Sequence, residues 1–161
     1  MCTTDCKVPS VTAPMALGDG DVEEFGLLSA ATDGPIVLAF FPAAFTGGCT
    51  EEMCTFRDSM ARFEEVDATV YGVSVDLPFA LNAFADEHDL NFPLVSDFEQ
   101  QLVEVFDVRL DGVMGLDGLA ERSVFVIDTD GVVRYEWVRE DGNPDFDELI
   151  STVESEVRRL V

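Results

Sequence analysis

Residues 36–41, Ile-Val-Leu-Ala-Phe-Phe, are six apolar residues in succession, and they restrict most strongly how this chain can fold. Such a run is typical of a β-strand that is buried on both faces, as in a sheet with helices on each side. Pro42 ends the strand because proline cannot donate to a strand ladder. A loop over residues 43–48 follows, and a helical pattern begins near Cys49. The sequence therefore predicts a buried strand, a loop and a helix in direct succession.

The rest of the chain alternates between strand and helix patterns. The patterns predict a short strand or hairpin at 22–31, strands at 70–75, 94–95, 123–127 and 132–138, and helices at 49–63, 78–88, 99–106 and 145–160. In the helix at 78–88 we expect Phe79, Ala83 and Phe84 to point inward. In the strand at 132–138 we expect Val133, Tyr135 and Trp137 to share one face.

This order predicts an α/β domain with a mixed central sheet flanked by helices, and the C-terminal hairpin is the arrangement of the thioredoxin fold. Residues 1–14 show little periodicity and are predicted to be a tail. Residues 15–161 are predicted to form one domain, because 161 residues suit a single core.

The charge of the chain is strongly negative, with 33 acidic against 9 basic residues and a formal net charge of −24. This balance argues against a nucleic-acid-binding surface and disfavours anionic membranes. An acid-rich composition with Lys7 as the sole lysine indicates adaptation to a salt-rich cytoplasm, and the alternative is an ordinary acidic protein. No apolar stretch is long enough for a membrane helix and no secretory signal is recognisable, so we expect a cytoplasmic protein.

Cys49 is the residue that most clearly points to chemistry. A cysteine at the start of a helix faces unpaired N–H groups and the positive end of the helix dipole, which stabilise a thiolate. Gly47 and Gly48 let the backbone approach a substrate closely, and Thr46 can place a hydroxyl beside the sulfur. We interpret Cys49 as a nucleophilic or redox cysteine, with a buried structural cysteine as the alternative.

The negative charges of two glutamates near Cys49 oppose the formation of a thiolate at this cysteine. Glu51 and Glu52 lie in the first helical turn, so their charge must be offset by an arginine. Arg122 begins a buried strand of the same sheet, where an arginine has to be paired. Arg57 is the weaker candidate because it lies roughly 12 Å further along the helix axis.

Three other cysteines complete the set. Cys54 follows Cys49 by five residues, a spacing that rotates the side chains about 140° apart on a helix. A disulfide between them requires the first turns of the helix to unwind, and the alternative is an inert helical cysteine. Cys2 and Cys6 are expected to be reduced, exposed tail thiols or an auxiliary disulfide. A metal site formed by these two with Cys49 or His88 is disfavoured by the spacing.

The segment Pro42-x-x-x-Thr46-x-x-Cys49 matches the signature of the peroxiredoxin family, at the end of the expected strand and the start of the expected helix. The resemblance extends to Gly72-Val-Ser-Val-Asp76, to Asn91-Phe-Pro-Leu-Val-Ser-Asp97 and to Arg122-Ser-Val-Phe-Val-Ile-Asp128. Residues 49–58 resemble the bacterioferritin-comigratory or PrxQ type, whereas residues 40–47 and 112–122 resemble the AhpE type.

The resemblance implies a thiol peroxidase. Cys49 would be the peroxidatic cysteine that attacks the hydroperoxide and becomes a sulfenic acid. Pro42 would shield it, Thr46 would orient the peroxide, and Arg122 would stabilise the thiolate and the transition state. Glu52 would position the arginine.

The family also implies the rest of the cycle. Cys54 would resolve the sulfenic acid as an intramolecular disulfide, and thioredoxin or a similar dithiol would reduce it. No metal or organic cofactor is needed, and a homodimer is consistent with the family. Two alternatives stay open, namely a redox sensor or relay and a one-cysteine peroxidase resolved by an external thiol. A thioredoxin-like oxidoreductase is disfavoured because Cys49-Thr-Glu-Glu is not a C-x-x-C motif.

Overall fold

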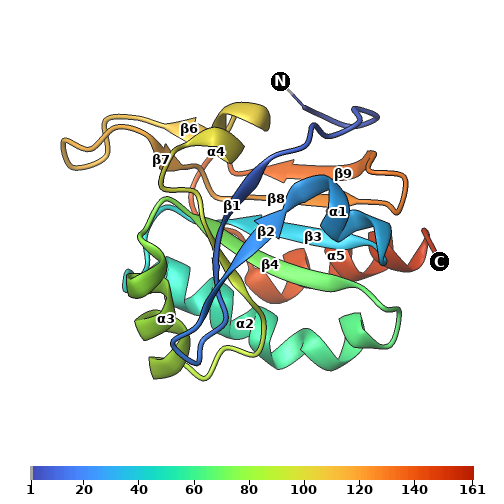
Figure 1. The fold of residues 1–161 in the computed structure, drawn as a ribbon, viewed down its shortest axis with the longest axis horizontal. Helices are drawn as coiled ribbons and strands as arrows, with labels where there is room; N and C mark the ends of the chain where they lie inside the picture. Colours follow the sequence, from blue (N-terminus) through green and yellow to red (C-terminus); the bar gives the residue numbers. More distant parts are fainter. Residues whose placement is uncertain (1) are drawn as a thin grey trace.

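The computed structural model describes residues 2–161 and contains a seven-stranded mixed sheet (Figure 1). The strand order is β2-β1-β5-β4-β3-β8-β9. These strands are β1 (Thr12–Ala16), β2 (Val22–Gly26), β3 (Ile36–Phe40), β4 (Thr69–Ser74), β5 (Leu94–Ser96), β8 (Ser123–Ile127) and β9 (Val133–Val138). Strand β3 is fully buried, runs parallel to β4 and pairs antiparallel with β8. The predicted α/β fold with a mixed sheet is confirmed.

Helices cover both faces of this sheet. They are α1 (Leu27–Thr32), α2 (Gly47–Glu64), α3 (Pro78–Glu87), α4 (Gln101–Val105) and α5 (Phe146–Arg158). One core cluster joins α2, α3 and α5 to one face, where they lie along the lower side of the sheet in Figure 1. A second cluster joins α1, α4 and the N-terminal segment to the other face. Both faces of β3 are thereby closed to water, which explains its continuous apolar run.

The β8–β9 hairpin contains a bulge that the alternation pattern did not predict. Ile127 pairs with Val133, but Val126 pairs with Tyr135, so one extra residue lies in β9. The bulge reverses the side-chain alternation, and Val133 joins one core cluster while Tyr135 and Trp137 pack against the other. The prediction that these three residues share a face was wrong for that reason.

Helix α3 buries a different stripe from the one predicted. Phe84 is buried as expected, but Phe79 is 73% exposed and Ala83 is also exposed. Asn82 takes the inward position instead, where it accepts from Gly18 N at 2.8 Å and donates to Asp21 O at 3.2 Å. A buried polar residue with satisfied hydrogen bonds is invisible to a purely hydrophobic pattern, which displaced the predicted face by one position.

The N-terminal segment contributes a strand to the central sheet. Strand β1 begins in the predicted tail, at Thr12, and ends beyond it, at Ala16, and it lies between β2 and β5 in the sheet. Pro14 lies within this strand, and β5 pairs with Met15 and Ala16, so that ladder ends before the proline. The division into a tail of residues 1–14 and a domain of 15–161 stays a prediction.

Cys2 and Cys6 form a disulfide with their Cα atoms 5.3 Å apart. Cys2 is only 2% exposed, and its N–H donates to the carbonyl of Val105 at 2.6 Å. The expectation of exposed, reduced thiols was therefore wrong, and the alternative of an auxiliary disulfide is what the structure contains. Helix α1 and the small hairpin of β6 (Arg109–Leu110) and β7 (Leu119–Ala120) were not predicted, because each is too short to show a period.

Candidate active site

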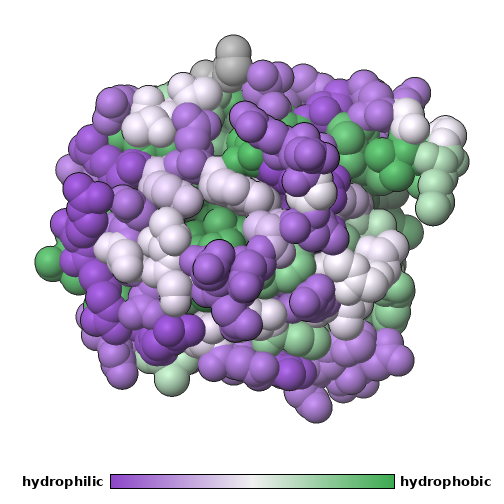
Figure 2. All heavy atoms as spheres, turned by 180° about the vertical axis from the view of Figure 1, so that it is seen from behind, coloured by the Kyte–Doolittle hydropathy of each residue, from purple (hydrophilic) through white to green (hydrophobic). Residues whose placement is uncertain are grey.

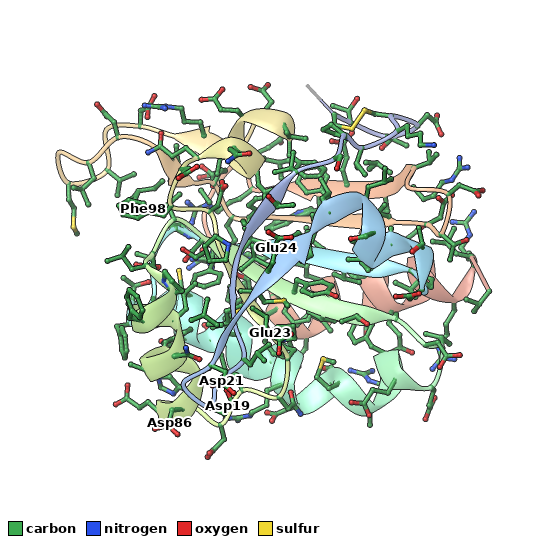
Figure 3. The ribbon with its side chains drawn as sticks, in the orientation of Figure 1. Asp19, Asp21, Glu23, Glu24, Asp86 and Phe98 are labelled. Atoms are coloured by element: carbon green, nitrogen blue, oxygen red, sulfur yellow. A yellow bond between two sulfur atoms is a disulfide. The ribbon has the colours of Figure 1, made fainter. Side chains whose placement is uncertain are left out.

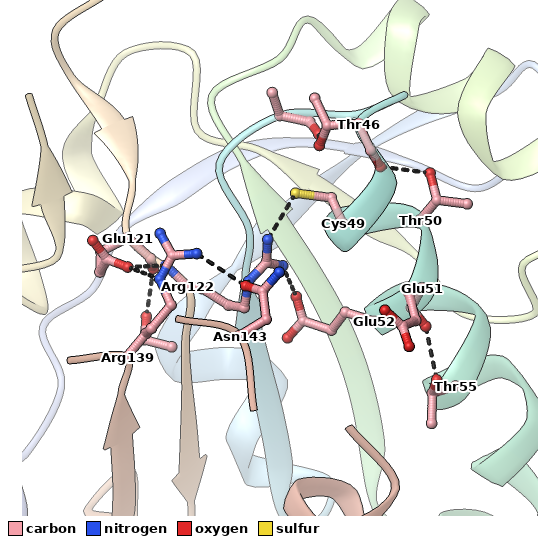
Figure 4. A network of polar contacts seen from close by, with 12 residues as sticks. Thr46, Cys49, Thr50, Glu51, Glu52, Thr55, Glu121, Arg122, Arg139 and Asn143 are labelled. Carbon is pink, nitrogen blue, oxygen red and sulfur yellow. Dashed lines mark hydrogen bonds and ion pairs between the residues drawn. The ribbon is translucent and has the colours of Figure 1, made fainter. Parts of the chain in front are cut away.

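Cys49 is the third residue of α2 and lies beneath the loop that leaves β3 (Figure 4). The helix begins at Gly47, two residues before the predicted start, with Thr46 as its N-cap. The first-turn N–H groups have no partner within the helix, and they surround Cys49 with positive potential. The side chain of Cys49 is 1% exposed, so bulk water does not screen this potential.

Arg122 reaches Cys49 from the start of β8. Its Nη2 donates to the Sγ of Cys49 at 3.4 Å, and its Nη1 donates to Glu52 Oε1 at 2.8 Å. Arg122 is 3% exposed, and its guanidinium carbon lies 5.6 Å from the centre of the Phe146 ring. Burial opposes the charge of Arg122, but Glu52 and Cys49 beside it hold its pKa above the usual value. A permanent cation therefore faces the sulfur.

Glu52 forms the other half of this buried ion pair. It is completely buried, and Oε2 has no hydrogen-bond partner among the described residues. Burial raises the pKa of Glu52 to about 7, although Arg122 and Arg139 lower it. Glu52, the predicted partner of Arg122, is thus in contact with it. Glu51, by contrast, is exposed, so water screens its charge from the site.

The other predicted residues of the site lie in the loop between β3 and α2. Pro42 is half-buried there. The hydroxyl of Thr46 donates to the carbonyl of Ala43 at 2.7 Å, which leaves its oxygen lone pairs able to accept from a ligand. Phe45, between them, has a φ of 68°, a left-handed conformation that is rare for an aromatic residue, and its ring packs on Phe84.

Arg57 does not belong to the site. Its Nη1 donates to the carbonyl of His88 at 2.6 Å and its Nε to Asp58 at 3.0 Å. His88 is partly buried, and its ring packs against Phe84 rather than lying free in solvent. Cys54 is a half-buried free thiol further along the intact helix. The structure therefore brings Cys49, Arg122 and Glu52 together and leaves Arg57 and Cys54 apart from them.

Three polar residues that bind Arg122 directly or through one another were missed by the sequence reasoning. Asn143 accepts from Arg122 Nε at 3.0 Å and from Arg139 Nη1 at 3.0 Å. Arg139 in turn donates to Glu121 at 2.8 Å. An arginine just after a predicted strand was the only signal in the sequence. Nothing in the spacing shows that the loop after β9 folds back over Arg122.

Two kinds of feature are absent from the described residues. Among residues 2–161, no group of three or more His, Cys, Asp or Glu side chains is arranged to hold a metal ion. Over the same residues, no helix combines the length and the apolar character needed to cross a membrane.

Comparisons with known proteins identify the family of the chain. The profile of the AhpC/TSA family matches residues 4–136. Peroxiredoxin Bcp of Bacillus subtilis (strain 168) is 42% identical over 120 residues, which cover 73% of this chain and 76% of that protein. Peroxiredoxin Bcp of Escherichia coli (strain K12) is 36% identical over 133 residues, 80% of this chain and 83% of that protein.

Two solved structures have the same fold over most of their length. The crystal structure of peroxidoxin BcpB from Mycobacterium tuberculosis matches with a TM-score of 0.84 at 32% identity, and it covers 100% of this chain and 99% of that one. The bacterioferritin comigratory protein of Xanthomonas campestris, studied for its alkyl peroxide reduction activity, matches with a TM-score of 0.73 at 27% identity, over 89% and 91% of the two chains. The chain belongs to the AhpC/TSA family and is a peroxiredoxin, a thiol-dependent peroxidase.

Proposed function

We propose that Cys49 is the residue that this peroxidase oxidises. The observation that carries the proposal is the 3.4 Å contact between Arg122 Nη2 and Cys49 Sγ at a helix N-terminus. The thiolate attacks the terminal oxygen of a hydroperoxide, an S–O bond forms and the O–O bond breaks. Cys49 becomes a sulfenic acid, and the alkoxide or hydroxide that leaves takes up a proton to give an alcohol or water.

In this proposal each of the neighbouring residues has a separate role in the reaction. Arg122 stabilises the thiolate and the charge that develops on the peroxide oxygens. Thr46 orients the peroxide through its hydroxyl, and half-buried Pro42 shields the sulfur from water. Glu52 holds Arg122 by its second nitrogen.

Resolution is proposed to occur through Cys54. Its thiol condenses with the Cys49 sulfenic acid, a disulfide forms and water leaves. A thioredoxin-like dithiol then reduces this disulfide and is itself oxidised. Both cysteines lie in the intact helix α2, where five residues span about 7.5 Å along the axis. The first turns of α2 must therefore unwind before the two sulfurs can bond.

One equivalent of hydrogen peroxide added to the reduced protein, followed by intact mass and peptide mapping, tests both steps. The Cys2–Cys6 disulfide is mapped separately. Loss of two hydrogens at Cys49 and Cys54 supports the intramolecular route, and Cys54→Ser should then gain one oxygen at Cys49. A gain of oxygen in the parent would instead indicate a one-cysteine enzyme. Unchanged peroxide consumption by Cys49→Ser would refute the assignment of Cys49.

Turnover distinguishes scavenging from signalling. A peroxidase should be recycled many times by a dithiol such as thioredoxin with its reductase. A redox relay would instead oxidise once and pass its disulfide to a partner protein. We propose the recycling enzyme, and steady peroxide consumption with a dithiol reductant is the measurement that decides.

We propose that the substrates include organic hydroperoxides as well as hydrogen peroxide. Phe45 supports this, because it precedes Thr46 directly and is more than half exposed, so an alkyl group can contact its ring. Comparing the rate constants for cumene hydroperoxide and hydrogen peroxide in the parent and in Phe45→Ala tests the idea. A substitution that lowers both rates equally would contradict a contact with the alkyl group.

A homodimer is also proposed. Leu77 and Phe98 are exposed and line one pocket of about 150 Å³, and exposed Phe79 lies two residues beyond Leu77. Exposed apolar side chains favour an interface between two copies of the chain. The acidic remainder of the surface repels a second copy, so the contact is expected at these apolar side chains. Light scattering after size exclusion should give twice the mass of the chain. A monomer at micromolar concentration would contradict the proposal.

The protein is proposed to work in a salt-rich cytoplasm. Figure 2 shows that hydrophilic side chains cover most of the face seen from behind, and Figure 3 shows Asp19, Asp21 and Asp86 gathered where the β1–β2 turn meets α3. Salt screens the repulsion among such carboxylates. The melting temperature should therefore rise between dilute buffer and molar KCl, and a flat response would refute salt adaptation.

A further inference from the structure

Two guanidinium groups converge on one atom of Asn143. Oδ1 accepts from Nε of Arg122 and from Nη1 of Arg139, each at 3.0 Å. Figure 4 shows the amide of Asn143 beside Arg122, with a dashed line joining it to Arg139. Because guanidinium groups can only donate, the atom between them has to be an acceptor.

Asn143 completes a three-point attachment of Arg122. Nη1 is bound to Glu52, Nε to Asn143, and Nη2 is left to face Cys49 Sγ. The guanidinium is planar, so two fixed nitrogens determine the direction of the third. With the ion pair to Glu52 alone, the guanidinium group could still rotate about that contact. The hydrogen bond from Nε to Asn143 prevents this rotation.

Arg139 is itself held in place. Its Nε donates to Glu121 at 2.8 Å, and its backbone N–H donates to the carbonyl of Arg122 at 3.0 Å. It therefore presents Nη1 to Asn143 from a fixed position next to Arg122. An asparagine accepts from both guanidinium groups without adding a charge, and a carboxylate at the same place would be paired with the same two cations.

Gly48 leaves the space that Asn143 occupies. A Cβ at position 48 would lie 2.7 Å from Asn143 Nδ2 and 3.1 Å from Arg122 Nη2. Asn143 is exposed on the loop between β9 and α5, while Arg122 beneath it is buried. The amide thus touches the first turn of α2 as well as the arginine.

We propose that Asn143 is a positioning residue for the peroxidase reaction, which orients the guanidinium of Arg122 toward Cys49 and is itself oriented by Arg139. The inference rests on the proposed role of Cys49. Asn143 acts through Arg122 and not on the substrate.

The test compares Asn143→Leu, which removes the acceptor and keeps the branched shape of the side chain, with Asn143→Asp, which keeps the acceptor. The rate constant for oxidation of Cys49 by hydrogen peroxide is measured by rapid quench, thiol alkylation and mass, between pH 5 and pH 9. Asn143→Leu should lose about tenfold at neutral pH, the size expected for a lost hydrogen bond to a charged group. Its rate profile should also move to higher pH, because the thiolate loses an aligned cation. Asn143→Asp should stay within about threefold of the parent, a range set by the same hydrogen-bond energies.

Asn91→Leu is the matched control, because Asn91 is exposed and, among the described residues, its amide donates to the carbonyl of Arg57 alone. It should leave the rate and its pH profile unchanged. Equal losses in the Leu and Asp variants of Asn143, or a parent-like rate and pH profile in Asn143→Leu, would overturn the inference. Peroxide consumption by Cys49→Ser, measured separately, distinguishes the two proposals. If this variant consumes peroxide as the parent does, the role of Cys49 fails; if it is inert, only the role of Asn143 is in question.

Discussion

The buried carboxyl of Glu52 makes the stability of this protein depend on pH near neutrality. In the unfolded chain its pKa is that of an ordinary glutamate, near 4.5, and in the folded protein burial raises it to about 7. Between these two values the folded state keeps a proton that the unfolded state has released. The folded state binds more protons, so its stability falls as the pH rises through this range.

The size of this effect follows from the two values. A rise from 4.5 to about 7 corresponds to about 3 kcal/mol at 1.36 kcal/mol per pKa unit. Most of this loss, about 2–3 kcal/mol, falls between pH 5 and pH 8. Glu52→Gln removes the titrating group and keeps an oxygen that can accept from Arg122 Nη1. The free energy of unfolding of the Gln variant, relative to the parent, should therefore increase by that amount over the same range.

Thermal unfolding of the reduced protein in constant high salt measures this. At roughly 2–4 °C per kcal/mol for a chain of this size, the melting temperature of Glu52→Gln should gain about 5–10 °C on the parent from pH 5 to pH 8. Glu51→Gln is the control, since it makes the same change one residue earlier at an exposed position. A difference between Glu52→Gln and the parent that stays constant with pH would mean that Arg122 keeps Glu52 ionised throughout, and the reasoning from burial would be refuted.

Three further predictions concern other parts of the molecule. Gly48→Ala should slow oxidation of the active-site cysteine about tenfold while the protein stays folded, because the new methyl group displaces the amide of Asn143, a movable side-chain end; a parent-like rate would contradict this. Asp97→Ala should cost about 2 kcal/mol in urea unfolding, because Asp97 accepts from two buried backbone N–H groups at the start of α4, both at 2.9 Å; a loss below about 0.5 kcal/mol, the size expected for an unimportant surface substitution, would count against it. Replacing both Cys2 and Cys6 by Ser should cost about 2 kcal/mol and leave the peroxide rate unchanged, because their short loop packs on the opposite face of the sheet; an altered peroxide rate would show that the disulfide is linked to the site.

The central unit of the fold could be predicted because its signals are local. Residues 36–41 are apolar without interruption, Pro42 ends the strand, and Cys49 follows at a helix start, as the structure confirms. The elements that escaped prediction are short or irregular. Strand β1 contains a proline, and the bulge in β9 depends on pairing with β8. Pairing across a sheet is a property of two segments, so one segment's pattern cannot reveal it.

The same difference between local and long-range signals decided which residues of the site could be predicted. Cys49 and Glu52 are neighbours on one helix, and their proximity can be calculated from the sequence. The need for an arginine also followed from the charges, and Arg122 was the favoured candidate. Asn143 could not be found in this way, because it lies in a loop 21 residues from Arg122 and meets it only through tertiary folding. Its short polar side chain is equally common in loops that have no partner at all.

The first turn of α2 has to meet two opposed demands in the proposed cycle. It must be intact to hold Cys49 against Arg122, and it must open before Cys54 can reach the sulfur. Two glycines lie in this turn, and the side chain of the N-cap, Thr46, caps no N–H group of the helix, so the turn is about 2–3 kcal/mol less stable than one of alanines with a good cap. From Met53 onward the helix is anchored in the core. The contact between Cys49 and Arg122 holds the weak turn closed while the sulfur is a thiolate. A sulfenic acid is neutral, so oxidation weakens the contact that activated the thiolate and thereby favours the opening that resolution requires.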